Sequence, residues 1–399
     1  MNIDTQRAID RTVGTIICRI LSLLYRVFKK NTAAQQPRRI LVILLSEMGA
    51  LVLAEPMLQR LRQKFPEAAL HVVLFEKNRE VVRLLGTIPD GNILAIDDRS
   101  MGSFTRDAVR LFFTMRKMKF DTVIDCELFS RISSIFSFLS GAGVRVGFHP
   151  HTQEGLYRGS FINRPVLYNP YHHISRQFIT LAEAIDSDTC PRAKRNVAQD
   201  TPQVPAVEFS AAEIEATRQR LYQRAPSIDG RRLVLIYPGG GLLPIRAWPL
   251  DYYCRLTEEL LARGYAVGVI GLAEDKAVAG AILAHARHEC CVDLTGYTAT
   301  VRELMQIFHF AALLITNDGG PGHFAAMTPI ETIIFYGPET PTLYGPLDKK
   351  AAIFYLGLSC SPCVTAYNHR KSPCDGDNVC LKMIEPDSVL EKALEILEG

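Results

Sequence analysis

Apolar runs of strand length alternate along the chain with segments in which apolar residues recur at helical spacing. In the first half, this pattern predicts strands over residues 40–45, 70–75, 93–96 and 122–125, and helices over 51–65, 104–118 and 130–140. In the second half it predicts strands over 233–237, 266–270 and 330–335, and helices over 252–263, 275–287 and 301–312. Alternation of this kind is typical of parallel sheets joined by right-handed crossovers. We therefore expect an α/β protein built from two such halves.

The length of the chain also indicates two domains, because 399 residues exceed what one core of ordinary size holds. Residues 200–205 are polar and contain two prolines, which is typical of a linker. The predicted organisation is a leading segment, a Rossmann-like domain, a linker, and a second Rossmann-like domain with a cysteine-containing tail. Their ranges are 1–37, 38–200, 201–229 and 230–399.

The leading segment is basic and amphipathic. The first 40 residues carry a net charge of +6, which leaves −3 for the remainder of a chain whose net charge is +3. This distribution argues against a nucleic-acid-binding protein and favours a basic anchor. Arg19 and Arg26 divide the apolar run, so it is too short for a membrane span of about 20 apolar residues and lacks the clean apolar core of a signal peptide. Two interpretations remain: a helix lying among anionic lipid headgroups, or a helix packed on the protein itself.

A glycine-rich segment follows an apolar run of strand length, residues 313–316, in the second half. Residues 317–323 read Asn-Asp-Gly-Gly-Pro-Gly-His and lead into a helix of small residues. Glycines let a ligand approach the backbone, and a helix N-terminus carries partial positive charge, so the pattern favours nucleotide phosphates. An ordinary strand-to-helix turn is the alternative. Residues 336–341 form a second loop at the same carboxyl edge, where open α/β sheets bind ligands.

These two loops resemble the donor-binding region of glycosyltransferase family 9, the ADP-heptose:lipopolysaccharide heptosyltransferases. Further matches, in the same order along the chain, are residues 40–50, 237–241, 246–249 and 293–296. The resemblance implies a GT-B fold, in which two Rossmann-like domains face a cleft. It also implies an inverting glycosyltransferase, peripheral on the inner face of the cytoplasmic membrane, that needs no cofactor for its chemistry. The expected reaction moves heptose from ADP-heptose to lipopolysaccharide or a related lipid-linked surface glycan.

Sugar transfer from a diphosphate needs groups that hold the leaving group and stabilise its developing charge. The resemblance implies that Arg246 contacts the diphosphate, with a surface arginine as the alternative. We expect His323 to donate to a phosphate or sugar hydroxyl, unless it is a satisfied core histidine, and Asp318 to bind sugar hydroxyls or to orient its loop. The predicted donor set is Gly239, Gly240, Gly241, Arg246, Glu274, Asp318, Gly319, Gly320, Gly322 and His323. Glu274, with the neighbouring Asp275, is expected near the ribose or base, and a solvated turn is its alternative.

The acceptor-side loop departs from the family pattern. The family has an aspartate, the candidate general base, where this chain has Ala50. Glu47 is predicted to replace it, so that Glu47 and Asp318 are the predicted catalytic residues. A helix-capping role or a contact to an acceptor hydroxyl is the alternative for Glu47. The loss of the aspartate also leaves open a catalytically silent nucleotide-sugar-binding or scaffold protein. The acceptor-side set is Ser46, Gly49, Asp125, Glu127 and Arg131.

Four of the ten cysteines are grouped near the C-terminus, at Cys360, Cys363, Cys374 and Cys380. One Cys-x₂-Cys pair followed by two more widely spaced cysteines is compatible with a structural zinc site. The other six are expected to be small buried hydrophobic residues. We expect a reducing compartment and therefore no disulfide framework.

Overall fold

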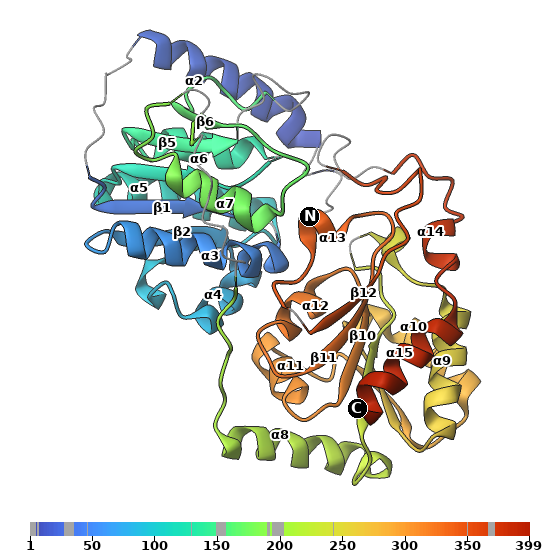
Figure 1. Cartoon of the computed structure of the whole chain (residues 1–399). Coiled ribbons are helices and arrows are strands. Elements are labelled where there is room, and N and C mark those ends of the chain that lie inside the picture. The colour runs from blue at the N-terminus through green and yellow to red at the C-terminus, as the bar shows by residue number, and fades with distance from the viewer. Residues whose placement is uncertain are drawn as a thin grey trace. The chain divides into compact units, whose positions relative to one another are not determined.

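The computed structural model describes residues 5, 8–27, 36–45, 47–128, 130–148, 157–189, 192–193, 203–241, 243–348, 350–365 and 372–399. The chain forms two compact units, Met1–Pro202 and Gln203–Gly399. Each unit contains a six-stranded parallel sheet flanked by helices (Figure 1). The predicted α/β class with two parallel sheets is confirmed.

The sheet of the first unit has the strand order β3-β2-β1-β4-β5-β6, and all neighbouring strands are parallel. Its strands are β1 (Arg39–Ile43), β2 (Ala69–Phe75), β3 (Ile93–Ile96), β4 (Thr122–Asp125), β5 (Val144–Phe148) and β6 (Arg164–Val166). Its helices after β1 are α3 (Met48–Lys64), α4 (Arg79–Leu85), α5 (Met101–Met118), α6 (Arg131–Leu139) and α7 (Ile174–Glu183). The residues of β1 from Ile40 onward are buried on both faces of the sheet, as central parallel strands require.

The sheet of the second unit has the order β12-β11-β10-β7-β8-β9. Its strands are β7 (Leu233–Tyr237), β8 (Ala266–Gly271), β9 (Cys291–Thr295), β10 (Leu313–Asn317), β11 (Glu331–Phe335) and β12 (Ala351–Phe354). Its helices are α8 (Ala211–Arg224), α9 (Leu250–Ala262), α10 (Lys276–Ala286), α11 (Val301–Phe308), α12 (Gly320–Ala325), α13 (Pro341–Tyr344), α14 (Val379–Lys382) and α15 (Pro386–Glu398). The range 201–229, predicted as a linker, contains α8, which packs against α11.

The leading segment forms a π-helical turn (Asp10–Gly14) and then α2 (Thr15–Val27), which lies alongside α6 (Figure 1). Cys18 is fully buried in a small core that Ile17, Leu21 and Tyr25 also contact. The Ser22 hydroxyl oxygen accepts hydrogen bonds from the Tyr157 hydroxyl at 2.8 Å and from the backbone N–H of Ser160 at 2.9 Å. One face of α2 is thus packed on the protein. Within the described part of the chain, no helix has the length and apolar character needed to cross a bilayer.

Candidate functional site

Three loops meet at the carboxyl edge of the second sheet. They follow β7, β10 and β11, which are neighbouring strands in the order β11-β10-β7. Parallel pairing places the ends of these strands at one edge, so residues 238–248, 318–323 and 336–341 are brought together there. The predicted donor residues lie in the first two loops, with the exception of Glu274, which follows β8.

Asn317, the last residue of β10, fastens two of these loops together. Its side chain is fully buried; Nδ2 donates to the carbonyl oxygen of Gly239 at 3.0 Å, and Oδ1 accepts from the backbone N–H of Trp248 at 2.9 Å. The Trp248 ring in turn stacks on Phe335, with ring centroids 4.6 Å apart. Sequence reasoning did not select Asn317. The available signal was an amide directly after the run Leu-Leu-Ile-Thr of a predicted buried strand, because a buried amide must find hydrogen-bond partners.

Arg246, Asp318 and Glu339 form a buried charged cluster, one residue from each loop. Nη2 of Arg246 donates to Oε2 of Glu339 at 2.5 Å, and its Nε lies 3.6 Å from Oδ2 of Asp318. The side chains of Arg246, Asp318 and Glu339 are 13%, 6% and 4% exposed, respectively. Burial raises the pKa of Asp318 to about 8; Arg246 opposes this shift and the Glu339 carboxylate adds to it. Burial would lower the pKa of Arg246, but the two carboxylates outweigh it and the net shift is upward.

The fold itself requires a glycine at some positions of these loops but not at Gly319. A Cβ at Gly240 would lie 2.7 Å from the carbonyl oxygen of Leu243, and one at Gly322 would lie 2.9 Å from Cδ1 of Ile334, so packing explains both. Gly241 has a positive φ of 58°, which favours glycine. A Cβ at Gly319, in contrast, would approach no atom closer than 3.9 Å. The fold does not require a glycine at 319, which is consistent with space kept for a ligand.

The helix that follows this loop, α12, is too short to carry a strong helix dipole. α12 spans six residues, so the first-turn backbone N–H groups are the available donors rather than a long macrodipole. His323 is a buried residue of this helix.

The acids after β8 are not equivalent. Glu274 is exposed in a short 3₁₀ helix (Ala273–Asp275). Asp275 accepts a hydrogen bond from the backbone N–H of Leu272 at 2.8 Å, and its carboxylate lies against Gly239, where a Cβ would approach Oδ1 to 2.9 Å. The structure therefore places Asp275, rather than Glu274, beside the glycine loop.

In the first unit, Glu47 is the N-cap residue of α3. Its backbone is extended, with φ −131° and ψ 128°, and its side chain makes no capping hydrogen bond. The structure therefore does not support the helix-capping alternative for this carboxylate. Gly49 and Ala50 lie in the first turn of α3. Ser46 falls outside the described residues.

The other acceptor-side candidates are tied into the protein interior. Asp125 is fully buried at the end of β4 and pairs with Arg158; burial raises the Asp125 pKa to about 6, even though Arg158 opposes the shift. Oε1 of Glu127 accepts from the backbone N–H of Leu45 at 2.7 Å. Nε of Arg131 donates to the carbonyl oxygen of Tyr157 at 3.0 Å. These bonds hold the carboxyl edge of the first sheet together, and an acceptor-binding role for the three side chains stays a prediction.

The C-terminal cysteines carry free thiols. Burial raises the pKa of Cys380, and the neighbouring Cys363, Cys360 and Cys374 thiols add to this shift, so the four lie within electrostatic range. Within the described ranges, however, no three Cys, His, Asp or Glu side chains are arranged to hold a metal ion. The geometry therefore does not support the predicted zinc site.

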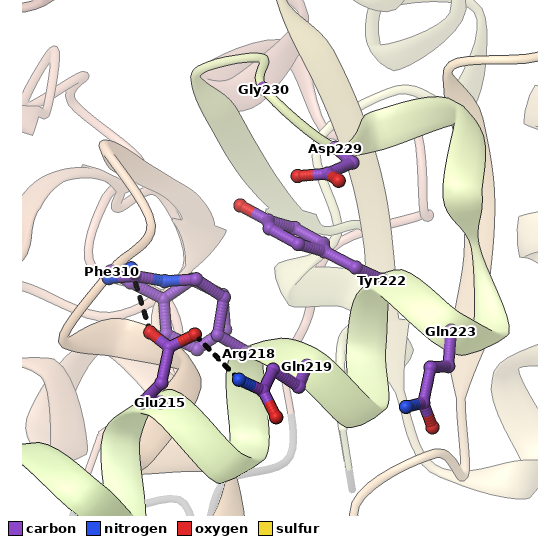
Figure 2. A pocket seen from close by; sticks show the side chains of 8 residues that line it. All are labelled: Glu215, Arg218, Gln219, Tyr222, Gln223, Asp229, Gly230 and Phe310. Carbon is purple, nitrogen blue, oxygen red and sulfur yellow. Dashed lines mark hydrogen bonds and ion pairs between the residues drawn. The ribbon is translucent and has the colours of Figure 1, made fainter.

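A surface pocket of about 680 Å³ lies on α8 (Figure 2). Its lining residues Gly230 and Phe310 precede β7 and β10, which places the pocket at the amino edge of the same sheet. Nη1 of Arg218 donates to Oε2 of Glu215 at 3.1 Å, and the Arg218 guanidinium lies 5.3 Å from the Phe310 ring centroid. Ion pairing and cation–π contact account for these side chains, and the pocket does not share a residue with the predicted donor site.

Comparison with known proteins identifies the family. A family model described as glycosyltransferase family 9 (heptosyltransferase) matches residues 108–372, which is more than half of the chain. The chain therefore belongs to glycosyltransferase family 9, as its motifs predicted, and it is a glycosyltransferase. This result does not favour the catalytically silent alternative.

Individual relatives agree with this assignment. The chain is 25% identical to lipopolysaccharide heptosyltransferase 2 of Escherichia coli (strain K12), over 90% of its own length and 98% of the relative. It is 24% identical to lipooligosaccharide heptosyltransferase 2 of Haemophilus ducreyi, over 80% of its length and 88% of the relative. The solved structure of E. coli ADP-heptose lps heptosyltransferase II shares its fold, with a TM-score of 0.69 at 22% identity over 90% of this chain and 98% of the other.

Proposed function

We propose that this member of glycosyltransferase family 9 transfers heptose from ADP-heptose to a lipopolysaccharide acceptor. The observation that carries the proposal is the convergence of Arg246, Asp318 and the open backbone at Gly319 on one edge of the second sheet. The names of the relatives supply the sugar, the nucleotide and the acceptor, because they describe heptosyltransferases that act on lipopolysaccharide or lipooligosaccharide.

Each part of the donor has a candidate partner in the loops. Arg246 and the first-turn N–H groups of α12 would hold the diphosphate and stabilise its charge as the glycosidic bond breaks. Asp318 and His323 would bind sugar hydroxyls. Asp275, beside Gly239, would meet the ribose or the base.

Donor binding tests these roles directly. Isothermal titration of ADP-heptose into Asp318→Ala and His323→Ala should show affinities more than tenfold weaker than wild type, because a buried polar group of the donor left without its hydrogen-bond partner costs about 1–3 kcal/mol. Asp387→Ala, a change at an exposed carboxylate on α15, is the matched control and should bind as wild type. Unchanged affinity in both site variants, with an unchanged melting temperature, would refute the assignment.

For the acceptor proton we propose Glu47 as the general base. It stands at the start of α3, at the carboxyl end of β1, three residues before the position where the family has its aspartate. Glu47→Gln should abolish transfer while donor affinity stays near wild type, since base catalysis is worth about 10²–10⁴ in rate. Ala50→Asp in that background should recover part of the rate. Wild-type turnover by Glu47→Gln would show that another group takes the proton.

We further propose that the enzyme works at the inner face of the cytoplasmic membrane and that α2 is its docking surface. Six apolar side chains of the leading segment are 43–69% exposed: Val13, Ile16, Ile20, Leu23, Leu24 and Val27. At 3.6 residues per turn they occupy an arc of roughly 100°, and it points away from the face that packs on the protein. Arg19 and Arg26, both exposed, border this arc. An apolar stripe beside arginines matches an anionic bilayer surface, where the stripe enters the acyl boundary and the arginines meet headgroups.

Vesicle sedimentation tests the docking surface. The Ile16→Glu/Leu23→Glu variant should stay in the supernatant with vesicles containing anionic lipid, whereas wild type should pellet. Val109→Glu/Phe113→Glu is the matched control, because those residues are exposed apolar side chains on α5. Equal pelleting of the α2 variant and wild type would refute the proposal. The proposal would also be refuted if light scattering showed that the wild-type protein is a dimer and that the α2 variant disrupts this dimer.

The zinc prediction has a direct test of its own. Metal analysis of the purified chain should find about one zinc per chain if the cysteines form a structural site, and Cys360→Ser/Cys363→Ser should remove it. A metal content near zero in the wild-type protein, purified without chelator, would dismiss the site.

A further inference from the structure

Glu339 lies in the centre of the donor site, although it belongs to none of the predicted sets. It follows β11 in the loop before α13, and its side chain is almost completely buried. Its contact to Nη2 of Arg246, at 2.5 Å, is a hydrogen bond. Asp318 lies farther from the same guanidinium, at 3.6 Å from Nε, and within the described residues its Oδ2 accepts no hydrogen bond. Glu339 is therefore the side chain that fixes the direction of Arg246.

The cluster contains one more acid than it has bases. Two carboxylates and one guanidinium share a buried site, so full ionisation would leave one uncompensated negative charge, which is costly at low dielectric. A donor diphosphate adds further negative charge at the same edge. The repulsion is relieved when one carboxyl group carries a proton, and a protonated carboxyl can donate a hydrogen bond to a phosphate or sugar oxygen.

We propose that Glu339 is a positioning residue for the nucleotide-sugar: it aims Arg246 at the diphosphate, and its negative charge adds to the effect of burial in favouring the protonated form of Asp318. This inference rests on the proposed donor function of the same site. The groups that act on Asp318 are Arg246 after β7, and Tyr336 and Glu339 after β11. Tyr336 donates its hydroxyl to the carbonyl oxygen of Tyr344 at 3.0 Å. Burial and Glu339 together raise the pKa of Asp318 against the opposing effect of Arg246.

The proposal separates two variants at the same position. Glu339→Gln keeps an acceptor for Arg246 but removes the charge, so Asp318 should lose its proton at lower pH. Donor affinity should then begin to fall nearer to neutral pH than in wild type, where the fall begins near pH 8. Glu339→Ala releases Arg246 and should weaken donor binding more than tenfold at every pH.

The experiment is titration of ADP-heptose, and of ADP, into wild type, Glu339→Gln and Glu339→Ala from pH 6 to pH 9. Glu331→Gln, the same substitution at the amino end of β11, is the matched control and should follow wild type. Melting temperatures establish that each variant is folded. If Glu339→Ala does not fold, the pH profile of donor affinity in Glu339→Gln decides the result by itself. A purely structural role of Glu339 would not shift that profile.

Two results would overturn the inference. One is a Glu339→Gln profile with the same pH midpoint as wild type, and the other is wild-type affinity in a folded Glu339→Ala. Failure of the proposed function gives a different pattern: the wild-type protein would bind ADP-heptose at no pH, and the inference would fall with it. A third pattern would refute only the role of Glu339: the wild-type protein binds ADP-heptose, Arg246→Ala weakens this binding, and the pH profile of Glu339→Gln is not shifted. The donor site would then remain in place.

Discussion

A side chain at Gly319 should block the donor and leave the fold intact. The backbone at Gly319 has φ 168° and ψ −171°, an extended conformation that valine adopts readily, and a Cβ there would approach no atom closer than 3.9 Å. The free energy of unfolding of Gly319→Val should therefore lie within about 0.5 kcal/mol of the wild-type value, as is usual for substitutions that touch no packed feature. If the open backbone holds the diphosphate, the new side chain displaces at least one charged hydrogen bond. At about 1.5–3 kcal/mol each, that loss weakens binding by roughly ten- to a hundredfold.

Gly322→Val provides the contrast, because its Cβ would lie 2.9 Å from Cδ1 of Ile334 and overpacking costs about 1–3 kcal/mol. The assay is calorimetric titration of ADP-heptose, combined with urea denaturation of both variants. The expected pattern is a stable Gly319→Val that does not bind and a destabilised Gly322→Val. A Gly319→Val protein that binds ADP-heptose as wild type would refute the reasoning that this space belongs to the ligand.

Three further predictions concern stability. Asn317→Ala should cost about 2–4 kcal/mol in urea denaturation, because it leaves the Trp248 N–H and the Gly239 carbonyl without their buried partner; a cost below about 1 kcal/mol would show that Asn317 does not fasten the loops. Burial raises the pKa of Glu55 to about 7, above its unfolded value, so wild-type stability should fall as pH rises from about 4.5 to about 7. Glu55→Gln should remove this fall and be more stable than wild type at pH 8 by about 1–3 kcal/mol, with little difference near pH 4; equal pH profiles would contradict it. Deletion of residues 1–27 should lower the melting temperature as well as membrane binding, because α2 belongs to a buried core; an unchanged melting temperature would show that α2 contributes no stability.

The regular part of the fold was accessible from the sequence because its strands are continuous apolar runs. The predicted strands over 93–96, 122–125 and 233–237 coincide with β3, β4 and β7. The strand β5 was not predicted, since Arg145 and Gly147 interrupt its apolar pattern. The structure shows why Arg145 is tolerated: its Nε donates to the carbonyl oxygen of Phe161 at 2.7 Å. That partner lies 16 residues away, and local periodicity does not reveal it.

In the site, too, only the features that lie close together in the sequence could be predicted. The glycine-rich loop could be found because its residues are consecutive. Asn317 acts on Trp248, and Glu339 acts on Arg246 across 93 residues, so their roles appear only when β7, β10 and β11 are paired. The leading helix is a related case. Its apolar residues cover two faces, and periodicity alone cannot say which of them packs on the protein.

The transfer reaction itself decides whether this chain is a heptosyltransferase. The full chain is incubated with ADP-heptose and a truncated lipopolysaccharide presented in anionic vesicles, and the acceptor is followed by mass spectrometry. The wild-type protein should add one heptosyl residue and release ADP, whereas Arg246→Ala and Glu47→Gln should do both far more slowly. A folded wild-type protein that leaves the acceptor unchanged, or that transfers a different nucleotide-linked sugar in preference to heptose, would contradict this expectation.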